Sequence, residues 1–197
     1  MEITLRLEIP KDWHEVERLT RQAFWDDANF RLTGMGCDEH YMVSCFRKSV
    51  EFIPELNYVA EVDGKIVGNI MYSHSYVEKY DGSRHNITTF GPLSVLPEYQ
   101  KKGVGSALMR HTLKKAAKMG FGAVIFYGHP TYYPRFGFKE AGSFGIKTAK
   151  GRTHPALMAM ERHYGDLDDV EGRFIESPLF HIDGEKALEY DKSKIWE

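Results

Sequence analysis

The segment LSVLPEYQKKGVGSALM, residues 93–109, constrains the fold of this chain more than any other feature. Its first residues are typical of a strand, its glycines of a tight turn and its last residues of a helix start, so the segment predicts an α/β fold. At such a junction, unpaired backbone N–H groups and the positive end of the helix dipole point to one place, which favours an anion. Gly103 and Gly105 leave room for phosphate oxygens, or they only shape the turn. Lys101 and Lys102 add positive charge beside them.

Hydrophobic periodicity predicts the elements around this junction. Two Asp-Gly pairs, at 63–64 and 81–82, separate strand-like runs and are typical hairpin turns, so three consecutive antiparallel strands are expected before the loop. Asp12 and Glu15 have capping-box spacing at the start of the first helix. The fold class is therefore α/β, with a mixed, mostly antiparallel central sheet and flanking helices. The expected strands are 4–9, 57–62, 65–77, 85–95, 123–127, 155–160 and 174–182, and the expected helices are 13–24, 41–50 and 104–117.

Length and charge restrict the class of protein. A chain of 197 residues, 42% of them apolar, can bury one full core, so we expect a single domain, 1–197. Residues 2–140 carry the motifs, and residues 141–197 form C-terminal strands and an extension. Lys and Arg number 26 against 28 Asp and Glu, which gives no electrostatic reason to bind nucleic acid. No apolar run approaches the ~20 residues of a membrane span, and the N-terminus lacks a signal-peptide pattern, so no membrane partner and a cytoplasmic location are expected.

The cysteines and the C-terminal end give weaker indications. Cys37 and Cys45 are expected to be free thiols, because a disulfide-dependent secreted domain would carry more cysteines. Together with His40 they fall short of the four closely spaced ligands of structural zinc, so no metal is expected. Residues 187–197 are amphipathic and could pack on the domain or on a second subunit, which leaves a homodimer open.

Two common nucleotide-binding motifs do not match these residues. A Rossmann fingerprint needs a third small residue where Leu108 stands, and a P-loop needs a Gly-Lys-Ser/Thr sequence that is absent. The loop Gln100–Gly105 instead resembles the acyl-CoA pyrophosphate loop of the GCN5-related N-acetyltransferases, [QR]-x-x-G-x-[GA], and matches it in full. Downstream, YYPRFGF is similar to the family's Tyr-x-x-x-Gly-Phe segment, with Tyr133 four residues before Gly137. The order of elements up to about residue 140 also agrees with the family.

This resemblance implies the acyl-CoA N-acyltransferase fold, in which the strand ending at Val95 splays from the strand AVIFY. The pantetheine arm of acetyl-CoA would insert in the gap and pair with backbone groups of that strand, and the loop amides would hold the pyrophosphate. The residues implied to bind acetyl-CoA, the cosubstrate, are Leu93, Ser94, Val95, Gln100, Lys101, Lys102, Gly103, Val104, Gly105 and Ser106.

Direct attack by an amine requires a base, because an amine with a pKa of ~10.4 is deprotonated in only about one molecule in 2,500 at pH 7. The family often uses a carboxylate on the central strands, and Glu61, His74 and His129 are the candidates here. Glu61 could equally be an exposed strand residue and His129 a hydrogen-bonded loop residue, so the choice stays open at this point.

Departure of the CoA thiolate is faster when a general acid supplies a proton. Tyr133 matches the family's donor, while neighbouring Tyr132 could serve instead and either ring could simply pack. Pro134 disfavours helical backbone angles at Tyr133, which is unlike family members whose tyrosine lies in a helix.

The sequence thus predicts an N-acetyltransferase that moves the acetyl group of acetyl-CoA to a primary amine of a small molecule or peptide within a ternary complex. Two alternatives remain: a non-catalytic CoA-binding or sensing module, and an acyltransferase with another acyl donor or acceptor. Retention of Tyr133 favours the enzyme. The acceptor is not encoded in any motif of the chain.

Overall fold

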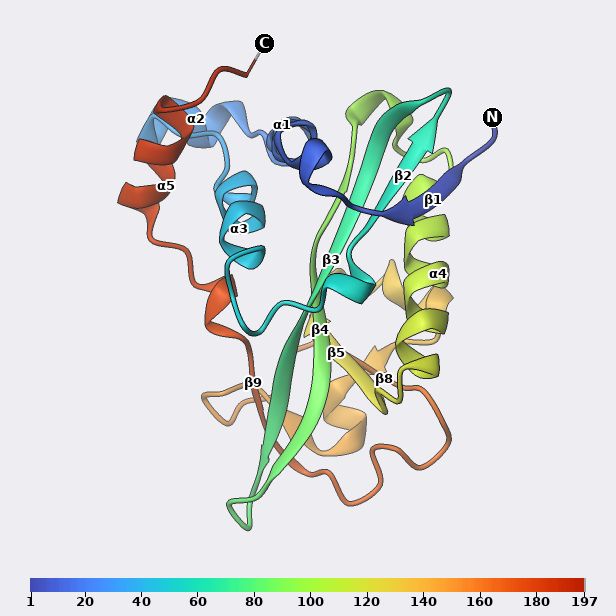
Figure 1. The fold of residues 1–197 in the computed structure, drawn as a ribbon. Coiled ribbons are helices and arrows are strands. Elements are labelled where there is room, and N and C mark those ends of the chain that lie inside the picture. Colours follow the sequence, from blue (N-terminus) through green and yellow to red (C-terminus); the bar gives the residue numbers. More distant parts are fainter. Residues whose placement is uncertain (197) are drawn as a thin grey trace. The chain divides into compact units, whose positions relative to one another are not determined.

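The computed structural model describes residues 1–196, which group into two compact units. The first comprises Met1–Met71, Gly91–Thr112 and the chain from Pro178 onward, and the second comprises Tyr72–Phe90 and Leu113–Ser177. Three long elements contribute residues to both units: β3 (Lys65–Lys79), β4 (Arg84–Val95) and α4 (Val104–Lys118) (Figure 1). The single domain over 1–197 stays a prediction.

The first unit pairs two short strands with the start of β3. β1 is antiparallel to β2, with Leu5 opposite Ala60, and β2 is antiparallel to β3. Left-handed angles at Asp63 and Gly64, with φ of 51° and 77°, close the hairpin between β2 and β3. The elements wholly within this unit are β1 (Thr4–Leu7), α1 (Trp13–Phe24), α2 (Asp27–Thr33), α3 (Glu39–Phe46), β2 (Tyr58–Val62) and α5 (Gly184–Lys192), with short 3₁₀ turns at Pro10–Asp12, Pro54–Leu56, Pro97–Tyr99 and Pro178–Phe180.

Helices cover both sides of these strands. α1 buries Leu19 and Thr20, and the Thr20 hydroxyl lies 3.1 Å from that of Ser94 on β4. Gly68 of β3 faces α4, since a Cβ at this position would lie 2.8 Å from a methyl carbon of Val104. Figure 1 accordingly shows α1 and α3 on one side of β2 and the first turns of α4 on the other.

The second unit joins strands from distant parts of the chain. β5 is antiparallel to β8, the end of β3 is antiparallel to β9, and β4 is parallel to β5 with Thr88 opposite Val124. The elements wholly within this unit are β5 (Ala123–Tyr127), β6 (Lys139–Glu140), β7 (Ile146–Lys147), β8 (Leu157–Glu161) and β9 (Gly172–Ile175), with 3₁₀ turns at Tyr133–Phe136 and Ala141–Phe144.

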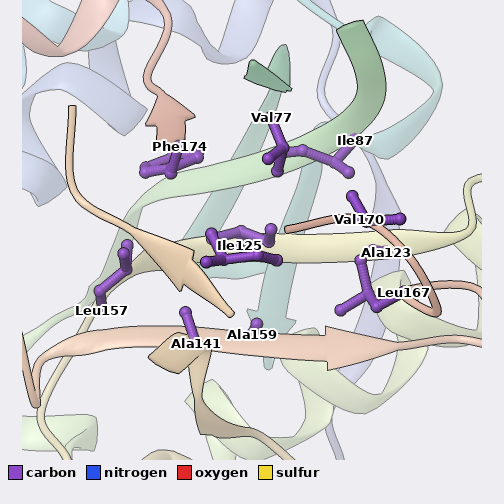
Figure 2. Close-up of a cluster of buried hydrophobic side chains, with 11 residues drawn as sticks. Val77, Ile87, Ala123, Ile125, Ala141, Leu157, Ala159, Leu167, Val170 and Phe174 are labelled. Atoms are coloured by element: carbon purple, nitrogen blue, oxygen red, sulfur yellow. The ribbon is translucent and has the colours of Figure 1, made fainter. Parts of the chain in front are cut away.

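Hydrophobic side chains of the second unit meet in one buried cluster (Figure 2). Ile125 of the continuously apolar strand β5 lies in its middle, with Val77 and Ile87 on one side and Ala159 on the other. The remaining members are Ala123, Ala141, Ile146, Leu157, Leu167, Val170 and Phe174. This cluster explains why β5 has no alternating polar positions before Tyr127: its side chains are buried on both faces.

The predicted fold class is confirmed. The pairs β1–β2, β2–β3, β3–β9, β5–β8 and β6–β8 are antiparallel, whereas β4–β5 and β7–β9 are parallel. Both Asp-Gly turns also form, and Gly82 takes a φ of 84° in the second. Within residues 1–196, no helix is both long and apolar enough to cross a membrane.

Three local predictions were wrong. The Asp12 carboxylate does not cap α1 with Glu15; it accepts hydrogen bonds from the Ile9 amide at 2.9 Å and from Arg6. The second predicted helix ends at Phe46 instead of Val50. The last predicted strand, 174–182, is divided between β9 and a 3₁₀ turn.

Candidate active site

The loop between β4 and α4 reverses direction within a few residues. After Val95 the chain forms the Pro97–Tyr99 turn, and the side-chain amide of Gln100 donates back to the Val95 carbonyl oxygen at 3.1 Å. Lys101 and Gly103 then take left-handed angles, with φ of 58° and 92°. The left-handed angle at Gly103 lies in the region that favours glycine over other residues.

The start of α4 has the features of an anion site. Its first helical hydrogen bond runs from the Ala107 amide to the Gly103 carbonyl at 2.9 Å, so the amides of Val104, Gly105 and Ser106 have no acceptor within the helix. A Cβ on Gly103, directly before these residues, would meet nothing within 4 Å, so the chain leaves this position open. The helix itself is held in place because Val104 is buried. The geometry therefore fits a phosphate group, which helix N-termini bind through such amides.

Cationic side chains flank the loop. Lys101 and Lys102 are both exposed, and the Lys102 ammonium lies 5.7 Å from the centre of the Tyr99 ring. The Lys65 ammonium approaches the same ring at 5.6 Å and pairs with Glu98 at 3.1 Å. The predicted positive charge beside the two glycines is thus present and accessible to solvent.

In the strand segment Leu93–Val95, the main chain is better suited than the side chains to contact a ligand. Ser94 is fully buried, and its hydroxyl is paired with Thr20 of α1. Leu93 and Val95 are half-buried, and the Val95 carbonyl already accepts the Gln100 amide, although a carbonyl oxygen has a second lone pair. Any contact of Ser94 with a ligand would therefore run through its main chain.

Tyr133 belongs to an aromatic group in the second unit. Its ring stands edge-on to Phe126 at 4.5 Å between centres, and Phe90 and Phe138 lie at 5.8 and 6.1 Å. Burial, and then the neighbouring Tyr132, raise the pKa of Tyr133 to about 12. The hydroxyl therefore keeps its proton at neutral pH. Within residues 1–196 the hydroxyl has no hydrogen-bond partner, so its proton is available to a bound molecule.

The backbone at Tyr133 differs from the prediction. Tyr133 is the first residue of a 3₁₀ turn, and Pro134 is its second. The prediction from Pro134 was wrong because proline disfavours helical angles before it but suits the first turn of a helix, where its missing N–H costs no hydrogen bond. The amides of Tyr132 and Tyr133 both approach the His129 carbonyl, at 3.0 and 3.4 Å, so the loop before the turn also fixes the tyrosine.

The candidate bases have different surroundings. Glu61 lies in the first unit on β2 and accepts hydrogen bonds from Arg6 at 2.6 and 2.9 Å. His129 is exposed in the second unit, where its Nδ1 lies 3.0 Å from the Thr131 hydroxyl. His74 is also exposed, and its ring packs on Phe121. His129 thus has the loop hydrogen bond that the sequence allowed, and it is joined through its backbone to Tyr133.

Both cysteines are free, as predicted. The Cys37 sulfur lies 3.5 Å from Nδ1 of His40, whose Nε2 lies 3.1 Å from Asp191. Burial raises the pKa of Cys37 to about 12 and lowers that of His40 to about 4. At neutral pH this buried pair is a thiol and a neutral imidazole, so it contributes packing and not a nucleophile.

Sequence reasoning did not find several residues that shape these segments. Gln100 was assigned only through its backbone, whereas its side chain also closes the loop. Thr20 holds Ser94 from a helix 74 residues away in sequence, a contact that no local pattern encodes. Gly128 could have been found, because it directly follows a buried strand and precedes the tyrosine segment.

Comparison with known proteins points to the same family as the sequence motifs of the loop and of the tyrosine segment. A family model described as an acetyltransferase (GNAT) domain matches residues 54–140, which include the loop and the tyrosine segment. The uncharacterised N-acetyltransferase YhbS of Escherichia coli K12 is 26% identical over 169 residues, covering 85% of this chain and 92% of that protein. The part of the chain that carries the loop and the tyrosine segment is therefore similar to the GNAT acetyltransferases. A second relative, the uncharacterised N-acetyltransferase YjhQ of the same organism, is 39% identical over 94 residues, and the match spans about half of that protein, 51%, and 47% of this chain.

Solved GNAT structures share the fold. The structure of Escherichia coli YhbS in complex with CoA has a TM-score of 0.78 at 23% identity, covering 92% of this chain and 93% of that one. A GNAT acetyltransferase of Brucella melitensis in complex with acetyl-CoA has a TM-score of 0.68 at 25% identity, covering 91% of this chain and 98% of that one. These complexes agree with acetyl-CoA as the cosubstrate of the family.

Proposed function

We propose that this protein is an acetyl-CoA-dependent N-acetyltransferase that acetylates a primary amine of a small molecule or peptide by direct attack within a ternary complex. The loop before α4 carries the proposal. Gly103 has a φ of 92° and open space where a side chain would be, and it directly precedes the helix amides that have no acceptor within α4. Backbone donors at a helix start, flanked by exposed lysines, are suited to a diphosphate.

The residues of the loop and of the preceding strand have distinct proposed roles. The amides of Lys101 through Ser106 bind the pyrophosphate, and Lys101 and Lys102 contribute charge. The Gln100 amide already donates to the Pro97 carbonyl at 3.2 Å, so Gln100 contributes through its side chain, which closes the loop. The main chain of Leu93, Ser94 and Val95 binds the pantetheine arm. The Ser94 hydroxyl is occupied by Thr20 and so holds the strand against α1. The proposed set is Leu93, Ser94, Val95, Gln100, Lys101, Lys102, Gly103, Val104, Gly105 and Ser106.

We propose Tyr133 as the general acid. Its hydroxyl proton would pass to the leaving sulfur while the amine nitrogen forms the new bond to the acetyl carbon. Because burial raises the pKa of Tyr133 to about 12, the donor form is present throughout the physiological range. Tyr132, the alternative, lies beneath the Arg135 guanidinium at 4.3 Å, a contact that already engages its ring.

The base that takes the amine proton is assigned to His129 in preference to Glu61. Glu61 accepts both of its Arg6 hydrogen bonds at Oε1, so this carboxylate is already held in an ion pair. His129 engages Nδ1 with Thr131, and its Nε2 has no hydrogen-bond partner within residues 1–196. The paired variants His129→Gln and Glu61→Gln test the choice: the variant that loses about 10²-fold or more in kcat identifies the base.

The deciding experiment measures release of free thiol from acetyl-CoA across a panel of polyamines, aminoglycosides, amino acids and peptides. Amine-dependent thiol release with wild-type protein, lost on substitution of Gly103, supports the proposal. A thermal shift with CoA, but no thiol release with any acceptor or with longer acyl-CoA donors, would favour the non-catalytic CoA-binding module. CoA at 100 times its Kd should add about 2.7 kcal/mol of stability, and NAD and ATP should add far less.

A cytoplasmic location fits a family that uses acetyl-CoA, and the amphipathic helix α5 could contact a second copy of the chain. Sedimentation of the purified protein at several concentrations decides between a monomer and a homodimer.

A further inference from the structure

The ring of Tyr133 is enclosed on one side by other aromatic rings. Phe126, Phe90 and Phe138 are each at most 4% exposed, and Phe126 lies 4.0 Å from Phe90 and 5.0 Å from Phe138 between ring centres. Tyr133 itself is only half-buried. These three rings are therefore fixed, whereas Tyr133, which also contacts the half-buried rings of Tyr132 at 5.0 Å and Phe136 at 6.4 Å, keeps part of its surface in solvent.

Gly128 lies against this group, and its lack of a side chain is required by space. A Cβ at position 128 would lie within 3.0 Å of ring carbons of both Phe126 and Tyr133, and 2.7 Å from Cδ2 of Tyr133. Gly128 is not among the glycines with left-handed φ, so its backbone conformation would accept an alanine. Its amide donates to the Ala156 carbonyl at 2.8 Å, which prevents the main chain from moving back.

A methyl group at this position would therefore strike both rings, and the ring that is held less tightly would move further. Phe126 cannot yield easily, because it is 2% exposed and packed on both Phe90 and Phe138. Tyr133 has solvent on one side, and its hydroxyl is not held by a hydrogen bond within residues 1–196. The added methyl would thus turn the Tyr133 ring.

We propose that Gly128 is a positioning residue for acetyl transfer, whose missing side chain sets the direction of the Tyr133 hydroxyl. The inference rests on the proposed function, in which Tyr133 donates a proton to the leaving sulfur. Gly128 itself contacts no substrate in this assignment. Its effect on the reaction should therefore exist only while Tyr133 carries a hydroxyl.

Gly128→Ala tests this role. We expect kcat to fall by about 10- to 100-fold, toward the value of Tyr133→Phe, while the Kd for CoA stays within twofold of wild type. Gly142→Ala is the matched control: it lies in the same unit, and its Cβ would make an ordinary 3.5 Å contact with Thr153. It should leave kcat unchanged.

The double variant Gly128→Ala/Tyr133→Phe separates positioning from general damage. If Gly128 acts through the hydroxyl, the double variant should have the kcat of Tyr133→Phe alone, whereas a purely structural effect would multiply the two losses. An unchanged kcat in Gly128→Ala beside a low kcat in Tyr133→Phe overturns the inference and leaves the acid in place. An unchanged kcat in Tyr133→Phe overturns the proposed acid, and the positioning role with it.

A second variant covers the case in which Gly128→Ala does not fold. Phe126→Leu/Gly128→Ala removes the ring edge of Phe126 that a methyl group would strike, which relieves the tighter packing, but it leaves the ring of Tyr133 in the path of the methyl group. Its kcat should therefore still be about tenfold or more below that of Phe126→Leu alone. A kcat within about threefold of Phe126→Leu would contradict the proposed crowding.

Discussion

Gly103 and Gly128 show two different reasons for a glycine in the segments that the proposed reaction uses. At Gly103 the backbone is left-handed and the space around a Cβ is open, whereas at Gly128 the backbone is ordinary and the space is filled by two rings. The loop around Gly103 thus leaves space that no other part of the described chain fills. The segment that contains Gly128 and Tyr133 is shaped by side-chain packing within the chain itself. Substitutions in the loop should therefore change binding, and substitutions in the tyrosine segment should change the chemical step.

The largest effect is expected from Gly103→Val. The side chain would occupy the open space in front of the α4 amides, so the Kd for CoA should rise by about 100-fold or more, which corresponds to about 2.7 kcal/mol. The left-handed φ also strains a valine, at a cost of about 1–2 kcal/mol of stability. Isothermal titration with CoA and thermal unfolding measure the two effects separately.

Gly120→Val is the control for strain. Gly120 lies at the other end of α4, with a φ of 86° and nothing within 4 Å of a Cβ. It should lose similar stability and keep the wild-type Kd for CoA. Equal Kd values in the two variants would remove the loop from the binding site and break the contrast between Gly103 and Gly128.

The next largest effect is expected from Tyr133→Phe. Phenylalanine preserves the ring contacts and removes only the hydroxyl, so CoA affinity should be unchanged while kcat falls by about 10²-fold. Tyr132→Phe serves as the control and should retain kcat. The reverse pattern, a loss confined to Tyr132→Phe, would transfer the acid to that residue.

The raised pKa of Tyr133 sets the pH dependence. With a pKa of about 12, the hydroxyl is protonated below that pH and loses its proton only as the pH rises through it. Where the chemical step limits the rate, wild-type kcat should not fall between pH 6 and 10, and Tyr133→Phe should show the same profile at a lower rate. A decline in wild-type rate near pH 8 that Tyr133→Phe lacks would show that the hydroxyl titrates far below this value.

The sequence predicted the elements that carry strong periodicity. β5 and α4 were predicted from a continuous apolar run and an apolar stripe, because burial of those residues leaves a regular pattern. α2 was not predicted, since it buries no residue and so has no stripe, although Asp26 caps its start and Gly34 ends it. Val50 was included in a helix on its apolar character alone, and it is 94% exposed.

The candidate site likewise has parts that follow from the sequence and parts that do not. The loop was predicted because its glycines and lysines act locally, within six residues. The Thr20–Ser94 hydrogen bond and the aromatic rings around Tyr133 join residues distant in sequence, and their partners follow only from the folded packing. The pKa of Tyr133 depends on that packing, so it could not be predicted from the motif.

The smallest effect is expected from Gln100→Ala, which tests how firmly the chain itself shapes the loop. The variant loses the hydrogen bond from the Gln100 side chain to the Val95 carbonyl, worth about 0.5–1.5 kcal/mol, so the Kd for CoA should rise by about 2- to 10-fold. Glu98→Gln, in the same loop but without a contact to Val95, should change the Kd by less than twofold, because its exposed pair with Lys65 contributes little. Titration calorimetry resolves the difference. A loss as large as that of Gly103→Val would mean that the loop depends on its own packing as much as the tyrosine segment does, and the contrast between the two segments would not hold.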